Sequence, residues 1–448
     1  TREMMAYNTA KLDAEATAYE ILALSAESKP VTARAVWHRP TEKTLKSLTE
    51  TLDIYEEIGI NLVFVETFYN GYSLFKSDNV QYHKDFEGAS YEGYPDYLTA
   101  FTELAAERGI EVHAWVENFY VGLTTDIEIL QEHPDWIMYN SDGTYIQKNE
   151  GGDYIFIDPA NPKVQDFVFS VFDNTMKLSP NIDYIKWDAN RHVENAGSEY
   201  LPEDKQSHFW IDYTQGFYKV MERIRAKYPD VLIQACASGG GRVEFGAMKY
   251  FNEVWTSDNT EALSRTRIQY GTSLFYPATV MGSHVSATPN HQTGNITPIK
   301  FRFDIACAGR LGMELQPKRM DDAEKRFARK AVASYKAYRD IVMEGDLYRI
   351  GTPYDDTGYY GMMYVSKDKK KAVLFTYCIR YQSRTLIPKF RLHGLDAKTR
   401  YTVREQNTDK KRFWFDGGTF TGEYLANAGI NPNLSKIYDS AVFVLEAQ

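Results

Sequence analysis

Cysteine is scarce in this sequence. Cys236, Cys307 and Cys378 are the three cysteines in 448 residues, and they are widely spaced and odd in number. Disulfide frameworks and structural zinc sites both need paired or clustered cysteines, so neither is expected. Cysteine usage therefore leaves the redox compartment of the protein open.

Long apolar runs and an excess of basic residues are also lacking. No apolar stretch approaches the roughly 20 residues that cross a bilayer, so we expect no membrane partner. Lysine and arginine number 51 against 61 aspartates and glutamates, which gives a formal net charge of -10. Proteins that bind nucleic acid usually present a basic surface, so we expect no nucleic-acid partner either.

The chain begins at Thr1 rather than at a methionine. We expect from this that an N-terminal segment has been removed or left out, and a secretory signal is one segment of that kind. The expectation that follows is a periplasmic or secreted location rather than a cytoplasmic one.

The composition is that of a large folded protein. With 43% hydrophobic residues over 448 positions, the chain can bury one large domain and a smaller one. Aromatic residues make up 14% of the sequence. Aromatic rings build ordinary cores and also stack on the apolar faces of sugars, so this content is compatible with a sugar-binding site without requiring one.

Strand-like and helix-like segments alternate through most of the chain. A helical segment is expected over residues 1–30, followed by eight strands that are each followed by a helical segment. The strands are expected at 33–37, 60–66, 110–117, 183–188, 231–236, 253–257, 278–282 and 311–315. Eight such units predict a (β/α)8 barrel, the TIM-barrel fold of the α/β class, which we place at residues 31–344.

The pattern changes after residue 344. Short alternating runs such as KAVLFTYCIRY (371–381) and SAVFVLEA (440–447) are separated by turns rich in lysine, aspartate and glycine. Runs of this kind predict antiparallel strands with one buried face. We therefore expect a smaller C-terminal antiparallel β-sandwich domain over residues 345–448.

Two acids follow predicted barrel strands. Asp188 closes the fourth strand and Asp258 lies just past the sixth. Because barrel active sites lie at the C-terminal ends of the strands, both side chains should face the same mouth. Glycoside cleavage requires at least two carboxyl groups, one as nucleophile or base and the other as acid, and two carboxyls across a barrel mouth meet this requirement.

Each acid also has a purely structural interpretation. Asp258 could cap a helix that begins near Asn259, since the stretch S-D-N-T-E is typical of a helix start. Asp188 could form a salt bridge with Lys186 or Arg191. Lys186 lies two positions before Asp188 and therefore on the same strand face, where its positive charge would favour the ionised carboxylate that a nucleophile requires.

The stretch CASGGGR (236–242) follows the fifth predicted strand. Its three glycines would let backbone N–H groups come close to a bound ligand. The spacing of nucleotide-binding glycine motifs is absent, so a nucleotide is not expected. Cys236 at the strand end could touch a substrate, although such a cysteine is more often a small buried apolar group.

Two histidines follow the seventh predicted strand. The spacing of His284 and His291 fits no short metal-ligand motif, and their loop lacks a partner carboxylate. We therefore expect hydrogen-bonding histidines that shape the barrel mouth, and we expect no metal and no cofactor.

Six motifs occur in order between about residues 133 and 350. They are HPDW (133–136), DYIKWDANR (183–191), CASGGGR (236–242), WTSDNTEALSRTRIQYGTSLFYP (255–277), MGSHVSATPNHQTG (281–294) and EGDLYRI (344–350). Together they resemble the melibiase-type α-galactosidases of glycoside hydrolase family 36. The resemblance implies that Asp188 is the nucleophile and Asp258 the acid/base of a retaining enzyme. It also implies sugar contacts from Trp115, Lys186, Cys236, Gly240 and Arg242.

The front of the chain departs from that family. Where the family has paired aspartates followed by Gly-Trp-Phe, this chain has FVETFYNG (64–71), with Glu66 and Thr67 as the nearest equivalents. A family arginine falls near Gly152, where Lys148 is the nearby cation. The segments 33–42, 72–78 and 108–119 are more similar to family-10-like glycosyl hydrolase barrels.

We therefore predict a retaining exo-α-glycosidase that hydrolyses terminal α-galactosides through a covalent glycosyl–Asp188 intermediate. Its partner would be an oligosaccharide or glycoside substrate, and a homo-oligomer is compatible with the sequence. The alternatives are a retaining glycosidase or transglycosylase for another α-linked sugar, such as an α-glucoside or α-N-acetylgalactosaminide, and a non-catalytic sugar-binding barrel.

Overall fold

The computed structural model describes residues 34–69, 72–76, 82–117, 120–122, 132–140, 143–144, 146–147, 154–178, 182–189, 196–381, 386–408 and 410–448, together with Tyr7 and Ala10. Apart from those two residues, the helical segment expected at 1–30 lies outside this set. Lys148, Gly152 and Arg191 also lie outside it.

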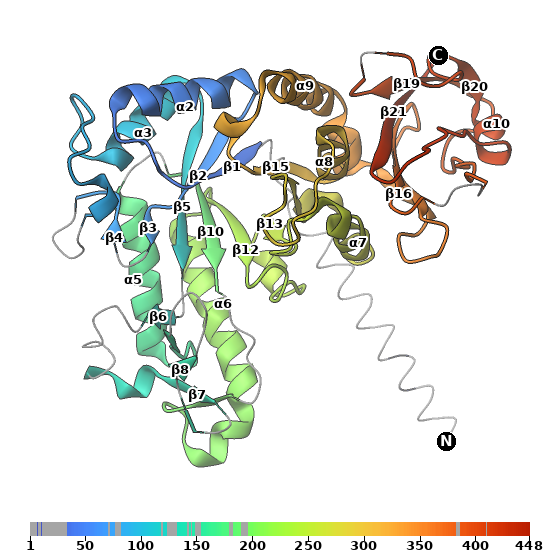
Figure 1. Cartoon of the computed structure of the whole chain (residues 1–448). Helices are drawn as coiled ribbons and strands as arrows, with labels where there is room; N and C mark the ends of the chain where they lie inside the picture. Colours follow the sequence, from blue (N-terminus) through green and yellow to red (C-terminus); the bar gives the residue numbers. More distant parts are fainter. Residues whose placement is uncertain are drawn as a thin grey trace.

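Eight parallel strands close into a barrel (Figure 1). They are β1 (Ala35–His38), β2 (Leu62–Val65), β5 (Glu111–Glu117), β10 (Tyr184–Asp188), β12 (Leu232–Cys236), β13 (Glu253–Trp255), β14 (Met281–Ser286) and β15 (Arg310–Glu314). Barrel strands that follow one another along the chain are neighbours in the sheet, and β1 closes the barrel by pairing with both β15 and β2. The predicted (β/α)8 fold is confirmed.

The barrel strands are apolar because both of their faces are covered. All four residues of β2 and all five residues of β10 are buried. Strands of this kind lose the alternation that marks a half-exposed sheet. The polar residues Lys186 and Asp188 in β10 therefore stand out, and both point to the inner face of the barrel.

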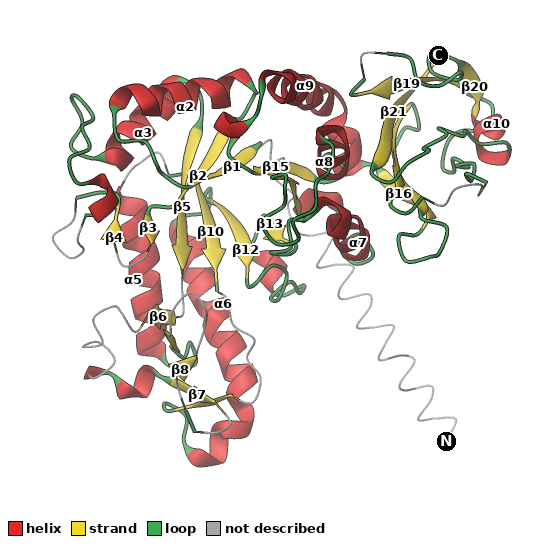
Figure 2. Cartoon of the chain, viewed as in Figure 1, coloured by secondary structure: helices red, strands yellow, loops and turns green. Residues whose placement is uncertain are grey.

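Helices surround the barrel (Figure 2). They are α2 (Leu45–Glu57), α3 (Tyr97–Glu107), α5 (Pro162–Leu178), α6 (Phe209–Lys227), α7 (Ala262–Thr272), α8 (Ile299–Ala306) and α9 (Asp322–Glu344). Two details differ from the sequence pattern. The helical piece expected after the fifth strand is only the 3-10 turn η4 (Ala247–Lys249), and the start of the seventh expected strand is a 3-10 turn, η5 (Ala278–Val280). Pro277 precedes η5 with an extended backbone, and β14 begins after the turn, at Met281.

Short strands extend the barrel beyond the C-terminal ends of β5 and β10 (Figure 1). β6 (Tyr120–Gly122), β9 (Tyr154–Phe156) and β8 (Ile146–Gln147) form one small sheet, and β11 (Ala196–Ser198) pairs with β7 (Met138–Asn140). A further hairpin joins β3 (Phe68–Tyr69) and β4 (Tyr72–Ser73) after β2. These additions follow β2, β5 and β10 at the face of the barrel on which active sites lie.

A six-stranded antiparallel sheet follows the barrel. Its order is β16-β17-β18-β21-β19-β20, formed by β16 (Asp346–Gly351), β17 (Tyr359–Val365), β18 (Lys371–Cys378), β21 (Asp439–Ala447), β19 (Arg400–Gln406) and β20 (Thr419–Thr421). The predicted smaller antiparallel β domain is confirmed. In the described residues, the outer face of this sheet is covered by loop segments and by α10 (Gly422–Asn427) rather than by a second sheet.

The inner face of the C-terminal sheet shares one hydrophobic core with α8 and α9. Tyr364 and Phe375 of the sheet belong to the same buried cluster as Phe301 of α8 and Val332 of α9. Asp304 of α8 is fully buried at this junction, and three side chains surround it. Its carboxylate accepts hydrogen bonds from Asn407 Nδ2 at 3.0 Å, Ser440 Oγ at 2.8 Å and Lys300 Nζ at 2.7 Å. The two domains are therefore joined by a continuous interior.

The helices that the structure describes include none long and apolar enough to cross a bilayer.

Candidate active site

The two predicted acids lie at the same face of the barrel. Asp188 is the last residue of β10, and Asp258 lies three residues past the end of β13. Burial of the carboxyl is the largest effect on Asp258 and raises its pKa; the charge of Lys186 lowers it, and the negative charge of Asp188 raises it further. The two acids are therefore close enough to influence each other electrostatically. A raised pKa favours the protonated carboxyl that a general acid needs.

Asp258 is not a helix cap. Helix α7 begins at Ala262, and its N-cap is Glu261, whose carboxylate accepts hydrogen bonds from the backbone N–H groups of Leu263 and Ser264. The capping interpretation of Asp258 is therefore wrong. Asp258 lies at the mouth with part of its surface exposed, whereas its carboxyl is partly desolvated and its Oδ1 accepts a hydrogen bond from Trp255 Nε1 at 2.9 Å.

Asp188 is buried at the end of its strand, with 6% of its surface exposed. In the barrel it lies beside Cys236 of β12. Of the two structural partners considered for it, Lys186 has its ammonium group over two indole rings, and Arg191 lies outside the described residues.

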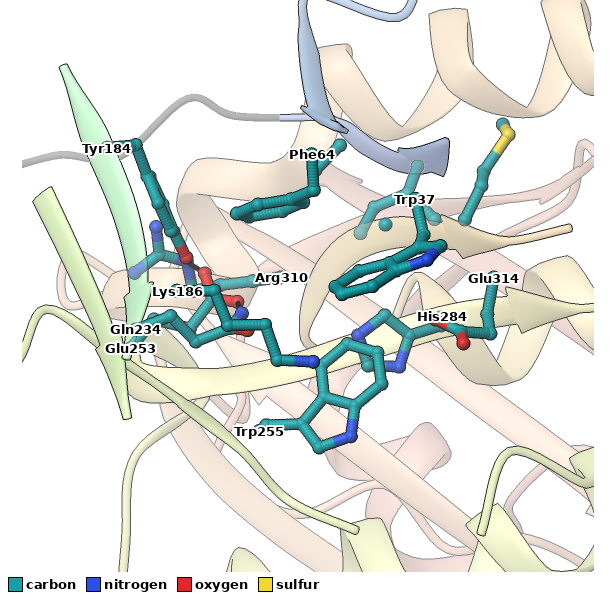
Figure 3. A pocket seen from close by; sticks show the side chains of 14 residues that line it. Trp37, Phe64, Tyr184, Lys186, Gln234, Glu253, Trp255, His284, Arg310 and Glu314 are labelled. Atoms are coloured by element: carbon teal, nitrogen blue, oxygen red, sulfur yellow. Dashed lines mark hydrogen bonds and ion pairs between the residues drawn. The ribbon is translucent and has the colours of Figure 1, made fainter. Parts of the chain in front are cut away.

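Lys186 lies between two tryptophans. Its Nζ is 3.9 Å from the ring centre of Trp255 and 4.6 Å from that of Trp37 (Figure 3). Contact with two aromatic faces stabilises a buried ammonium group. Lys186 therefore brings a positive charge to the interior of the barrel mouth and contacts the faces of two indoles.

Glu66 follows β2 and is held by protein groups on both of its oxygens. Oε1 accepts hydrogen bonds from Trp37 Nε1 at 2.6 Å and from Arg39 Nη2 at 3.0 Å, and Oε2 accepts one from Arg39 Nε at 2.6 Å. The Arg39 side chain is 65% exposed, whereas that of Glu66 is 5% exposed. Arg39, which the sequence did not single out, is therefore the solvent-facing member of this pair.

The glycine-rich loop after β12 packs against the segment that carries Asp258. Gly239 has a φ of 85°, and a Cβ atom placed on it would lie 2.5 Å from the Cα atom of Ser257. A side chain at this position would displace the backbone next to Asp258. In Gly240 the added atom would lie 3.2 Å from the carbonyl oxygen of Thr256. These glycines allow two strand ends to approach each other.

Three other residues were predicted to contact the sugar: Cys236, Arg242 and Trp115. Cys236 is buried, and desolvation raises the pKa of its thiol, so it is neutral. Arg242 donates from Nη2 to the hydroxyl of Tyr213 at 2.7 Å and from Nε to the carbonyl of Ala189 at 3.2 Å, next to Asp188. Trp115 lies on β5 in register with Lys186, but its side chain is outside the described part of the chain.

Glu314 is a third carboxyl at the mouth that the sequence reasoning missed. It is the last residue of β15, and it lines the same pocket as Trp37, Lys186 and Trp255 (Figure 3). Its Oε2 is buried and accepts no hydrogen bond from the described residues. Burial is the main reason that its pKa is raised. The rule that selected Asp188, an acid at the end of a barrel strand, would also have selected Glu314.

The floor of this pocket is closed by an ion pair. Arg310 Nε lies 2.7 Å from Glu253 Oε2, and Gln234 donates to the other oxygen of Glu253. His284 lies above this layer, and desolvation lowers its pKa well below the usual value, so it is neutral. Among the residues that the structure describes, no group of three or more metal-ligating side chains is arranged to hold an ion.

A (β/α)8 barrel with a carboxyl pair at the C-terminal ends of its strands is the arrangement that glycoside hydrolases use. The chain belongs to the Melibiase family, whose model matches residues 29–345, and residues 359–445 match the glycosyl hydrolase family 36 C-terminal domain. The first match includes the front part of the barrel, for which the sequence predicts a similarity to family-10-like barrels.

Several relatives are α-galactosidases. The chain is 33% identical to alpha-galactosidase AgaA of Geobacillus stearothermophilus over 354 residues, which is 79% of this chain and 46% of that protein. It is 36% identical to probable alpha-galactosidase C of Aspergillus flavus over 367 residues, or 79% of this chain and 45% of that protein. The crystal structure of the GH36 alpha-galactosidase AgaB from G. stearothermophilus matches 94% of this chain and 56% of its own, with 28% identity and a TM-score of 0.79. The chain thus spans about half the length of these proteins.

Proposed function

We propose that this chain carries the catalytic domain of a retaining exo-α-galactosidase. The observation that supports this most is the pair formed by buried Asp188 and by Asp258, whose pKa is raised, in a barrel of the Melibiase family. Two carboxyls in different environments can divide the roles of nucleophile and acid between them.

In the first step, a carboxylate oxygen of Asp188 attacks the anomeric carbon of the terminal sugar. The bond from that carbon to the glycosidic oxygen breaks, and Asp258 donates its proton to the departing oxygen. In the second step, Asp258 takes a proton from a water molecule, which attacks the anomeric carbon and releases the sugar and the Asp188 carboxylate.

The sugar would lie at the mouth above the Lys186 sandwich. We propose that Glu66, Trp115, Lys186, Cys236, Gly240 and Arg242 line its subsite. Variants of AgaA have been solved in complex with raffinose and with stachyose, which are α-galactosyl oligosaccharides. Oligosaccharides with a terminal α-galactosyl unit are therefore the substrates that we propose for this chain.

A second candidate is the same chemistry on another α-linked sugar. The observation that favours it is the Arg39–Glu66 pair, which stands where the family has paired aspartates. A site with fewer free carboxylate oxygens holds sugar hydroxyls differently, and selectivity depends on such contacts. Only the subsite would change, because Asp188 and Asp258 would keep their roles.

The experiment is a panel of aryl α-glycosides assayed with the purified protein. We expect the α-galactoside to be hydrolysed fastest, with the α-anomer of galactose released first, as double displacement requires. A preference for an α-glucoside or an α-N-acetylgalactosaminide would support the second candidate. If every glycoside were bound and none cleaved, the chain would be a sugar-binding barrel, contrary to both proposals.

A further inference from the structure

Trp255 makes three contacts that no prediction from the sequence included. Its Nε1 donates a hydrogen bond to Asp258 Oδ1 at 2.9 Å. One ring face receives the ammonium group of Lys186 at 3.9 Å, and the centre of the His284 ring lies 3.8 Å from the centre of the indole (Figure 3). The residue is the last of β13, is 6% exposed, and pairs in register with Gly282 of β14. The direction of its N–H is therefore fixed by a strand and by packing.

A carboxyl group that acts as an acid has two oxygens that are not equivalent in a protein. An oxygen that already accepts a hydrogen bond from an N–H donor is a poor place for the acidic proton, because donor and proton would then compete for it. The proton is then carried by the other oxygen. In Asp258 the occupied oxygen is Oδ1, which leaves Oδ2.

We propose that Trp255 is a positioning residue that keeps the transferable proton of Asp258 on Oδ2 and holds that oxygen toward the glycosidic oxygen of the substrate. This inference deepens the proposed function and rests on the assignment of Asp258 as the acid. In the cleavage step the Oδ2–H bond breaks and the proton passes to the leaving oxygen, while Oδ1 keeps its hydrogen bond from the indole. When water attacks, Oδ2 takes the proton back.

Several charged or titratable groups face Asp258 and must be kept constant in a test. They are Lys186 and Asp188 from β10, Cys236 from β12 and Glu314 from β15. Replacing Trp255 by phenylalanine leaves all four in place, and it keeps an aromatic ring beside Lys186 and His284. It removes only the N–H donor and part of the ring area.

The first measurement does not depend on turnover. In protein labelled with 13C at the aspartate carboxyl carbons, the Asp258 signal is identified by its absence in Asp258→Asn. The indole N–H stabilises the ionised carboxylate, so Trp255→Phe should raise the titration midpoint of this signal by about one pH unit. An unchanged midpoint would overturn the inference.

The second measurement is kinetic. In the wild type, the basic limb of the kcat/KM profile reports the acid of the free enzyme, and in Trp255→Phe it should move to higher pH with the NMR midpoint. If the proton is carried by the wrong oxygen of Asp258, cleavage of substrates with poor leaving groups is slowed most, because these substrates depend most on protonation. We therefore expect a loss about tenfold larger on an alkyl α-galactoside than on a nitrophenyl α-galactoside. Equal losses on both would indicate a structural role only and would contradict the proposal.

Trp37→Phe is the matched control. Trp37 is the other ring of the Lys186 sandwich, and its N–H binds Glu66 rather than Asp258. The control should weaken substrate binding and leave both the Asp258 midpoint and the basic limb in place; a shift as large as that of Trp255→Phe would overturn the inference.

A second variant covers the case in which Trp255→Phe does not fold. Benzothienylalanine at position 255 has sulfur in place of the indole N–H and the same bicyclic shape, and the same shift in the NMR midpoint is expected.

The outcomes also separate the two proposals. A wild-type protein that cleaves no α-galactoside would contradict the proposed function, whereas a cleaving wild type with an unshifted variant would contradict only the role of Trp255.

Discussion

At the mouth of the barrel, strands β10 to β15 contribute Asp188, Trp255 and Glu314, whereas β1 and β2 contribute Trp37 and Glu66. The motifs that carry the family resemblance surround the first group, whereas FVETFYNG (64–71), which contains Glu66, is the departure expected from the sequence; the family model matches both regions. On the β10–β15 side, one acid is buried and the other has a raised pKa. On the β1–β2 side, the carboxylate is bound on both oxygens by Trp37 and Arg39. The difference indicates that the carboxylate of the β1–β2 side can vary separately from the two acids that we propose cleave the bond.

Removing the nucleophile should have the largest effect. Asp188→Gly should lower kcat by about 10⁴-fold or more, because the covalent step cannot occur. Added azide should restore part of the rate by attacking from the vacated face, with a β-galactosyl azide as the product. Product analysis by NMR checks this outcome. If the variant kept most of its activity, the assignment of the β10–β15 side as the catalytic side would be wrong.

Removing the acid should have a smaller effect that depends on the substrate. Asp258→Ala should slow raffinose hydrolysis by roughly 10²- to 10⁴-fold. A nitrophenyl α-galactoside should be slowed much less, because a good leaving group needs little protonation. Steady-state rates on the two substrates provide the measurement, with circular dichroism as a control for folding. A similar loss on both would show that Asp258 is not the acid.

The chain that joins β5 to β10 contains a buried aspartate that should make the stability of the fold depend on pH. Asp158 is fully buried beside Ser198, and burial raises its pKa to about 6. In the unfolded chain an aspartate ionises near pH 3.9, so raising the pH from 4 through 6 favours unfolding, and the total loss of about 3 kcal/mol is reached about one pH unit above the folded-state pKa. In Asp158→Asn this loss of stability with pH should be absent. Urea titrations at pH 4 and pH 7 measure the difference, and parallel pH dependence in both proteins would contradict the assignment.

The smallest change is expected on the β1–β2 side. Glu66→Gln removes the charge that pairs with Arg39 and should weaken transition-state binding of α-galactosides by about 1 to 3 kcal/mol. Thr67→Ser, a neighbouring change that keeps the hydroxyl, is the control and should alter kcat/KM little. If Glu66→Gln had no effect on kcat/KM, Glu66 would not contribute to the sugar site. A role of the β1–β2 side in sugar binding would then have no support from Glu66.

Most of the fold could be predicted because the barrel repeats one simple unit. Eight apolar runs with intervening helices leave few other architectures, and acids at strand ends have a known location in this fold, which makes Asp188 and Asp258 candidates for the site. The seventh strand was placed three residues early because an apolar run such as ATVMG fits a strand and a 3-10 turn equally well.

The contacts of the site could not be predicted in the same way. The bond from Trp255 to Asp258 depends on the path of the loop that follows β13, and the position of Lys186 between two indoles depends on distances between strands. Neither is encoded by a spacing in the sequence. The same applies to Arg39, which is 27 positions from its partner Glu66. Glu314 had a sequence signal, since it ends a barrel strand, but it lies outside the motifs that carried the resemblance.

The junction around Asp304 limits how this protein can be recombined with its relatives. The carboxylate belongs to the barrel, while two of its hydrogen-bond donors, Asn407 and Ser440, belong to the C-terminal sheet. A chimaera joined at the boundary near residue 345 would bring a foreign sheet against this buried charge, and any partner that failed to supply both donors would leave the charge incompletely solvated. Exchange of the C-terminal sheet therefore requires the outer surface of α8 to be exchanged with it, so the natural unit of transfer crosses the domain boundary.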